Sequence, residues 1–229
     1  MPAKDIQKFI LDNDIIGFFD KPITLKSGRT SHFYVNWRTA TIDAFLLDQI
    51  TDYLCAYIKE LDFPWDSLYG VPEGASKTAM ITALKLAKAS EGFQKGSHVV
   101  SMGRGKVKEH GSADNKYFIG MPKGRTLVLE DTTTTGLSLI ACIKDLQKAG
   151  VEVTAAIGMT DRMEKRDDGL SVEEALHKEC GEHIKYIAIT KATDLLPLAA
   201  QKVKPKESVR EALTKEFEAY GVANIDWGH

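Results

Sequence analysis

The segment from Glu130 to Ser138 combines acidic, hydroxyl and glycine residues in an order that suits a phosphorylated sugar. It reads Glu130-Asp131-Thr132-Thr133-Thr134-Thr135-Gly136-Leu137-Ser138. Small residues let the backbone approach phosphate oxygens, threonine hydroxyls donate hydrogen bonds, and a helix start offers unpaired N–H groups. The two carboxylates are suited to ribose hydroxyls or, through water, to Mg²⁺. The pattern therefore predicts a phosphate site after a strand.

The same segment has a simpler interpretation, in which threonine side chains cap the following helix. The two acids directly before the threonines, at the end of an apolar strand, favour the phosphate site. The chain contains neither GxxxxGK[ST] nor GxGxxG. A Walker loop and a dinucleotide loop of these types are therefore excluded.

Two basic segments extend this prediction to a larger anion. Residues 21–38 hold four basic residues and no acid, with the aromatic run 32–34 after the turn. These residues suit a flat anionic ring. An aromatic side chain can stack on the ring, and Lys or backbone N–H groups can bind its negative charge. The alternative is a solvated turn leading into an edge strand.

The second basic segment contains Arg104, Lys106, Lys108 and His110. Cations that close over a diphosphate stabilise the charge that develops on it as it leaves. The alternative is an exposed basic loop with no ligand.

These segments lie between apolar strands and amphipathic helices that alternate from residue 67 onward. Strands are predicted at 67–71, 98–102, 125–131, 153–159 and 184–190. Helices are predicted at 4–12, 42–61, 76–89, 137–150, 171–180, 192–202 and 207–219. This alternation is typical of a parallel sheet covered by helices on both faces. Ligands of such sheets bind beyond the carboxyl ends of the strands, where the chemistry-bearing segments fall.

The composition excludes some broad classes of function. Lys plus Arg number 30 and Asp plus Glu 32 in 229 residues, so the formal net charge is −2, which argues against a nucleic-acid coat. No apolar run is long enough to span a membrane, and the N-terminus does not resemble a signal peptide. Three distant cysteines favour reduced thiols over a disulfide framework or a zinc site. We therefore expect a cytoplasmic protein with no nucleic-acid or membrane partner.

Three motifs, in this order, closely resemble those of the orotate phosphoribosyltransferase family within the type I phosphoribosyltransferases. They are LKSGR-x-S from residue 25, R-x-x-x-K-x-H-G from residue 104 and ED-x-x-TTG from residue 130. The resemblance covers nearly the whole chain. It implies a five-stranded parallel sheet flanked by helices, with an N-terminal hood. It also implies one phosphoribosyltransferase domain over 1–229, divided into hood (mainly 1–40), core (about 41–203) and C-terminal helical segment (204–229).

The activity that this resemblance implies is transfer of a phosphoribosyl group from 5-phosphoribosyl-1-diphosphate (PRPP) to N1 of orotate. The products are orotidine 5′-phosphate and pyrophosphate, in pyrimidine biosynthesis. Mg²⁺ is expected to bridge diphosphate and ribose oxygens, with no direct protein ligand assigned. A homodimer is implied, in which the loop 104–110 reaches the neighbouring site.

The family's residue roles carry over to the matching positions of this chain. PRPP would be bound by Lys26, Lys106 and the segment from Glu130 to Ser138. Orotate would be contacted by Tyr34, Val35, Thr134 and Arg162, where Arg162 pairs with its carboxylate. The catalytic residues would be Arg104, Lys108, His110 and Asp131. For Arg162 the alternative is a surface ion pair with Asp161 or Glu164.

The chain departs from the family pattern at two places. Gly105 follows Arg104 where the family usually has Lys, so Lys106 serves instead or the site has one cation fewer. The expected pyrophosphate loop contains Glu73, Gly74, Ala75 and Lys77, but its Lys comes later than in many members. Glu73 would act on Mg²⁺-bound water.

Three other functions fit these residues less well. A phosphoribosyltransferase for another base is disfavoured because Lys26 and Arg162 suit an anionic substrate. A nucleic-acid-binding regulator would need a basic stripe outside the site, whereas the bases concentrate in the predicted loops. A bifunctional enzyme is not expected, because the chain ends soon after its last predicted helix.

Overall fold

The centre of the computed structural model is a parallel sheet, which confirms the predicted α/β class. The structure describes residues 3–25, 28–104, 110 and 116–228. In spatial order the strands are β3 (Ser67–Gly70), β6 (Thr126–Thr133), β7 (Val153–Asp161) and β8 (Lys185–Lys191). Leu127, Val128 and Leu129 are fully buried, as expected for a strand covered on both faces.

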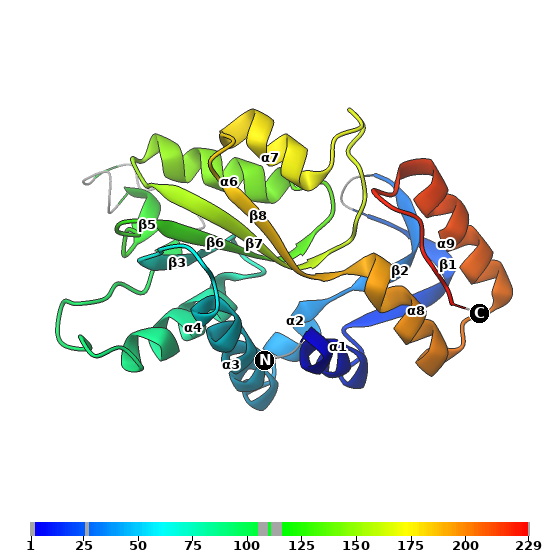
Figure 1. Cartoon of the computed structure of the whole chain (residues 1–229), viewed down its shortest axis with the longest axis horizontal. Coiled ribbons are helices and arrows are strands. Elements are labelled where there is room, and N and C mark those ends of the chain that lie inside the picture. Colours follow the sequence, from blue (N-terminus) through cyan, green and yellow to red (C-terminus); the bar gives the residue numbers. More distant parts are fainter. Residues whose placement is uncertain (1–2, 26–27, 105–109, 111–115, 229) are drawn as a thin grey trace.

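Helices cover both faces of this sheet (Figure 1). One face carries α6 (Leu137–Lys148) and α7 (Val172–Cys180), and the other carries α3 (Ala44–Lys59) and α4 (Ser76–Lys88). Leu127 and Leu129 belong to the core on the α3 and α4 side, while Val128 belongs to the opposite core. The alternation follows from strand geometry, since successive side chains point to opposite faces. In the described part of the chain no helix is long and apolar enough to cross a membrane.

The predicted fifth strand at 98–102 is not part of this sheet in the residues that the structure describes. Only Met102–Gly103 forms a strand, β4, and it pairs antiparallel with β5 (Phe118–Ile119). A central strand needs side chains buried on both faces, whereas Val100 is 40% exposed. The sheet therefore has four described strands, and the β4–β5 pair closes the base of the segment that contains the predicted cationic loop.

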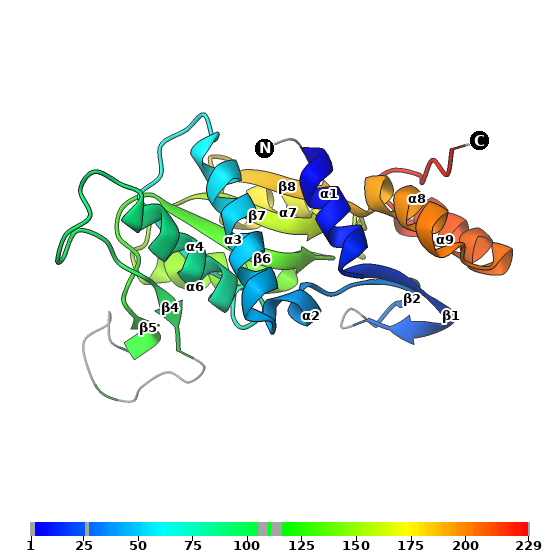
Figure 2. The same ribbon diagram turned by 90° about the horizontal axis from the view of Figure 1, so that it is seen from below.

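A second layer at one end of the sheet combines segments from early and late in the chain (Figures 1 and 2). Its elements are α1 (Ala3–Asp12), β1 (Ile16–Thr24), β2 (Thr30–Val35), α8 (Ala192–Val203) and α9 (Glu207–Tyr220). The strands β1 and β2 form an antiparallel hairpin, which contacts α8 and α9. The resemblance implies a hood built mainly from residues 1–40, whereas this layer also contains two C-terminal helices.

The helices predicted from apolar spacing are all found, with each end within two residues of its predicted position. The short helix α2 (Trp37–Thr41) was not predicted, because five residues are too few to show helical periodicity. It connects the hairpin to α3 and lies near the carboxyl end of β6 (Figure 2).

Candidate active site

The predicted pair of acids lies inside β6, close to its carboxyl end. Glu130 and Asp131 are each only 9% exposed, and the strand continues beyond them to Thr133. As neighbours in a strand they point to opposite faces of the sheet. The negative charge of Glu130 acts on Cys142 of α6, whereas Asp131 lies against Gly74, just before α4. The structure therefore directs these two side chains, both assigned to PRPP by the resemblance, to opposite faces of the sheet.

Both oxygens of the Asp131 carboxylate have polar neighbours. Oδ1 accepts a hydrogen bond of 2.9 Å from the backbone N–H of Thr132. Oδ2 lies 3.5 Å from Nε of Arg38, on α2. This arrangement orients a carboxylate at the sheet edge, where it can accept hydrogen bonds from a diol.

The start of α6 lacks the side-chain cap that the simpler interpretation of the threonine run required. The residue before the helix is Gly136, at φ 69° and ψ 6°, and no side-chain hydrogen bond caps the helix. A Cβ at this left-handed position would also lie 3.0 Å from Cγ1 of Val172, which favours glycine here. Thr134, Thr135 and Ser138 are half-buried around this turn, and Leu137 is exposed. An uncapped helix N-terminus among hydroxyl groups is well suited to an anion.

A hydrogen-bonded chain holds this turn to the two neighbouring strands. The hydroxyls of Thr133 and Tyr186 lie 2.6 Å apart, and Tyr186 donates to Oδ2 of Asp161 at 2.8 Å. Burial raises the pKa of both Tyr186 and Asp161, which favours their protonated forms. The sequence does not predict this support, although the position of Asp161, two residues after the predicted strand 153–159, was an available signal.

The loop after β3 contacts the acid site through Gly74. A Cβ on Gly74 would overlap the Asp131 carboxylate, and one on Gly70 would lie 2.5 Å from the carbonyl oxygen of Ala75. The loop is therefore a tight turn against the sheet edge. Glu73 is exposed and Ala75 is buried. Lys77 is directed away from the turn, because its Nζ donates to the carbonyl of Thr41 at 2.8 Å.

The base of the cationic segment adjoins the same loop. A Cβ on Gly103 of β4 would lie 2.2 Å from the hydroxyl of Tyr69 and 3.2 Å from Cγ of Pro72. The backbone N–H of Arg104 donates to Tyr117, and its Nε donates to the carbonyl of Phe118 at 3.2 Å. His110 is exposed. The predicted residues Lys106 and Lys108 lie outside the described residues, as does Lys26.

The hairpin does not bring Tyr34 and Arg162 onto one face. Phe33 is fully buried and its ring lies 3.7 Å from the guanidinium carbon of Arg162. Tyr34 points to the other face of β2, where it covers Gly17 and its ring centroid lies 5.0 Å from that of Phe19. Val35 is half-buried against the core.

Arg162 is buried in a network of ion pairs and hydrogen bonds and is only 3% exposed. Its Nε donates to Glu164 at 2.8 Å, and a terminal nitrogen donates to the hydroxyl of Ser31 at 3.0 Å. The same nitrogen lies 3.8 Å from Oε1 of Glu216, on α9. The pairing with Glu164 matches the alternative interpretation of Arg162, but it is internal rather than on the surface. The backbone N–H of Arg162 donates to Thr133, so the residue still borders the phosphate turn.

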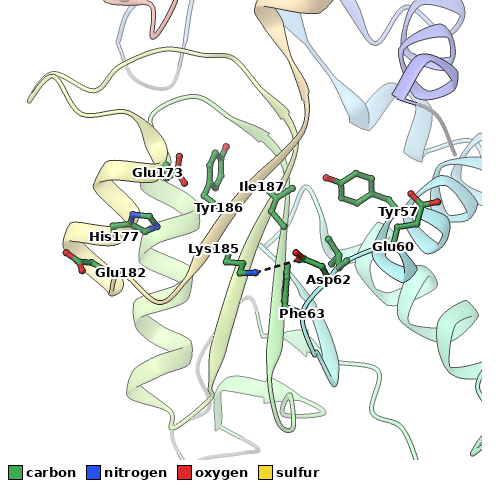
Figure 3. A pocket seen from close by; sticks show the side chains of 11 residues that line it. Tyr57, Glu60, Asp62, Phe63, Glu173, His177, Glu182, Lys185, Tyr186 and Ile187 are labelled. Carbon is green, nitrogen blue, oxygen red and sulfur yellow. Dashed lines mark ion pairs between the residues drawn. The ribbon is translucent and has the colours of Figure 1, made fainter.

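A broad hollow of about 620 Å³ lies elsewhere, along the start of β8 (Figure 3). Two of its basic groups already have partners: Lys185 lies 3.7 Å from Asp62 and 4.2 Å from the Phe63 ring, and His177 bonds to the carbonyl of Ile184. It lies at the amino end of its strand, whereas ligands of parallel sheets bind at carboxyl ends. We therefore assign the site to the ends of β3, β6 and β7.

Comparison with known proteins gives a consistent result. No protein-family model matches the chain. An orotate phosphoribosyltransferase of Bradyrhizobium diazoefficiens is 34% identical over 156 residues, which are 64% of this chain and 76% of that protein. One from Marinobacter nauticus is 29% identical over 194 residues, covering 83% of this chain and 86% of that protein.

The fold is also similar to that of a solved orotate phosphoribosyltransferase. The crystal structure of an orotate phosphoribosyltransferase from Francisella tularensis matches with a TM-score of 0.68. The match covers 95% of this chain and 99% of that one, at 19% sequence identity. At this identity the likeness establishes the fold, while the sequence relatives carry the family relationship.

Proposed function

The chain belongs to the orotate phosphoribosyltransferase family, and we propose that it transfers the phosphoribosyl group of PRPP to N1 of orotate. In this reaction the bond between the anomeric carbon and N1 forms, and the bond to the diphosphate oxygen breaks. The proton on N1 is released, and the products are orotidine 5′-phosphate and pyrophosphate. The anomeric carbon passes through an oxocarbenium-like state, so no protein nucleophile is required.

The turn before α6 is the observation that carries this proposal. Gly136 leaves the helix start without a side-chain cap, and Thr134, Thr135 and Ser138 surround it. These groups suit the 5-phosphate, while the adjacent Asp131 suits the ribose diol. In the proposal PRPP also contacts Lys26, Lys106, Glu130, Thr132, Thr133 and Leu137. The tight turn 73–77 would adjoin the diphosphate.

The cationic segment would stabilise the leaving pyrophosphate. In the proposal Arg104, Lys108 and His110 close over the diphosphate and exclude water from the reacting carbon. A homodimer would let this segment serve the neighbouring subunit's site. Mixing Lys108→Ala protein with Asp131→Asn protein tests this arrangement: a verified heterodimer should recover activity, and an inactive heterodimer would contradict sharing.

Orotate is proposed to lie between the hairpin and the phosphate turn, near Tyr34, Val35, Thr134 and Arg162. The amide of Arg162 is bonded to Thr133, which supports this location. The guanidinium is engaged with Glu164 and Ser31. Pairing with orotate therefore requires the carboxylate of the substrate to replace one of these partners, with a shift of β2 that admits it.

Mg²⁺ is proposed as a partner of the substrate rather than of a protein cage. No group of three or more His, Cys, Asp or Glu side chains suited to a metal ion occurs among the described residues. A single carboxylate at the sheet edge fits an ion that keeps its water and binds substrate oxygens. When bound it would neutralise diphosphate charge, while Asp131 orients the diol. The proposal also includes an N-terminal hood, mainly residues 1–40, and a single phosphoribosyltransferase domain over residues 1–229.

An absorbance assay tests the proposed reaction. Protein mixed with PRPP, Mg²⁺ and orotate should consume orotate, and Asp131→Asn should abolish most of this activity. Asp145→Asn is the matched control, because Asp145 is an exposed acid on α6, where its side chain is 74% accessible. Turnover of a purine base in place of orotate would overturn the substrate assignment.

A further inference from the structure

Arg38 presents an exposed guanidinium to the acid at the centre of the candidate site. Its side chain is 72% exposed, and Nε lies 3.5 Å from Oδ2 of Asp131. The Asp131 side chain is only 13% exposed, but the guanidinium is largely solvated, and a pair with a solvated partner contributes only about 0–1 kcal/mol to stability. Holding the fold together is therefore a weak reason for an arginine at this position.

The helix that carries Arg38 is anchored on both sides. Before it, Asn36 caps α2 by accepting from the N–H of Arg38, and Nε1 of the buried Trp37 donates to the hydroxyl of Thr160 at 3.0 Å. At the other end, Thr41 accepts from Lys77 of α4. These bonds tie α2 to β7 and α4, so the backbone of Arg38 has a fixed position at the sheet edge.

Arg38 also adjoins the turn after β3, which is proposed to lie beside the diphosphate. Oδ2 of Asp131 is the atom that Arg38 approaches and also the atom closest to a Cβ built on Gly74. The guanidinium therefore lies beside the tight turn after β3. Lys77, the cation that follows this turn, donates a hydrogen bond to the carbonyl of Thr41. Glu73 adds an exposed acidic side chain to the turn.

We propose that Arg38 is a substrate-binding residue that donates to the diphosphate of PRPP. The inference rests on the proposed function. When the ribose diol binds Asp131, the guanidinium is released from its ion pair and offers its planar donors to phosphate oxygens, a geometry that suits arginine. Arg38 thus supplies the positive charge that Lys77 does not bring to the turn.

Calorimetry on the full chain separates this role from a structural one. PRPP, inorganic pyrophosphate with Mg²⁺, and ribose 5-phosphate are titrated into wild type, Arg38→Gln, Arg38→Lys and Arg125→Gln. Arg125 is the matched control, because it forms an exposed pair with Asp66 at 2.8 Å just before the amino end of β6. Arg38→Gln should weaken PRPP and pyrophosphate by about tenfold to a hundredfold, the effect of one hydrogen bond to a charged group. Arg38→Lys should recover part of this loss, and Arg125→Gln should bind as wild type does.

Ribose 5-phosphate is the deciding ligand. Its affinity should not change in Arg38→Gln, because it has no diphosphate. An equal loss for ribose 5-phosphate and pyrophosphate would mean that Arg38 acts only through Asp131, and unchanged pyrophosphate binding would also overturn the inference. If wild type binds PRPP and consumes orotate, and Arg38→Gln binds PRPP and pyrophosphate equally well, the inference about Arg38 is wrong while the proposed function stands. Wild type that binds no PRPP would reject the proposed function as well.

Discussion

A Cβ atom on Gly74 would lie 2.4 Å from Oδ2 of Asp131, so the backbone of the turn after β3 packs directly against this carboxylate. Substituting Gly74→Ala must displace one or the other. Misplacement of a site group by about 1 Å costs up to about a hundredfold in rate, and we expect a loss of this order in kcat/KM for PRPP. Gly92→Ala is the control, since a Cβ there meets nothing within 4 Å. Wild-type kinetics in Gly74→Ala would contradict the placement of Asp131 in the site.

Lys77 is expected to stabilise the contact between α4 and α2. Lys77→Met removes the hydrogen bond to the carbonyl of Thr41 and should lower the free energy of unfolding by about 1 kcal/mol. Pyrophosphate affinity should fall far less than in Arg38→Gln. Urea unfolding and calorimetry on the same samples measure both quantities. Lys148→Met is a control for stability, because Lys148 pairs with the exposed Asp145 on the same helix. A loss of pyrophosphate affinity equal to that of Arg38→Gln would make Lys77 a ligand.

Arg162 should be one of the costliest residues to replace. Arg162→Met removes the cation beside the buried Glu216 and leaves Glu164 with the more distant Arg29, at 3.8 Å, and breaking a buried pair in this way costs about 3–5 kcal/mol. Adding Glu164→Leu should recover part of the loss, because the uncompensated charge is then removed. Urea unfolding of both variants checks this, with the exposed Arg125→Met as the comparison. A single-variant loss no greater than that of Arg125→Met would refute the prediction.

Glu216 should make stability decline as pH rises above its ordinary pKa of 4.5. Burial raises the pKa of this carboxyl, Glu164 adds to the shift, and Ser31 and Arg162 oppose it. The folded chain therefore binds the proton more tightly than the unfolded chain does. The stabilisation is complete below about 4.5 and is lost as pH rises through the folded pKa.

Unfolding free energies measured across this range should decline less in Glu216→Gln than in wild type. Asp66 gives a control of opposite sign, because hydrogen bonds from Arg125 lower its pKa to about 2. Its contribution is present above 3.8 and is lost as pH falls toward 2. A wild-type-to-Glu216→Gln difference that stays constant with pH would rule out titration of this carboxyl.

The sequence was sufficient for the elements whose apolar period is long and regular. It located every helix except α2 and the four strands of the sheet, and it placed Asp131 and the threonine turn near the carboxyl end of one strand. It overestimated 98–102, because two valines suggest a strand locally while the burial of a central strand depends on distant neighbours. The opposed directions of Glu130 and Asp131 depended on β6 extending to Thr133, which a polar run does not reveal.

The sequence also did not predict contacts between residues that lie far apart in the chain. Two contacts depend on where α2 is anchored. They are the ion pair of Arg38 with Asp131 and the hydrogen bond from Lys77 to the carbonyl of Thr41. The burial of Arg162 depends on α9, whose Glu216 gives no sequence signal of its own. A charged residue has the same appearance in a sequence whether it is solvated or enclosed.

The bond from Arg162 to Ser31 joins residues 131 positions apart in the chain. A contact of such long range closes a large loop at a cost in conformational entropy, whereas β6 and β7 are neighbouring strands of the central sheet. Native proteins open locally with a range of free energies, and ligand-binding elements belong to the low end of that range. We therefore expect amide hydrogens of β2 to exchange with solvent before those of β6, so that the wall proposed to receive the substrate ring is also the part of the native chain that opens most readily.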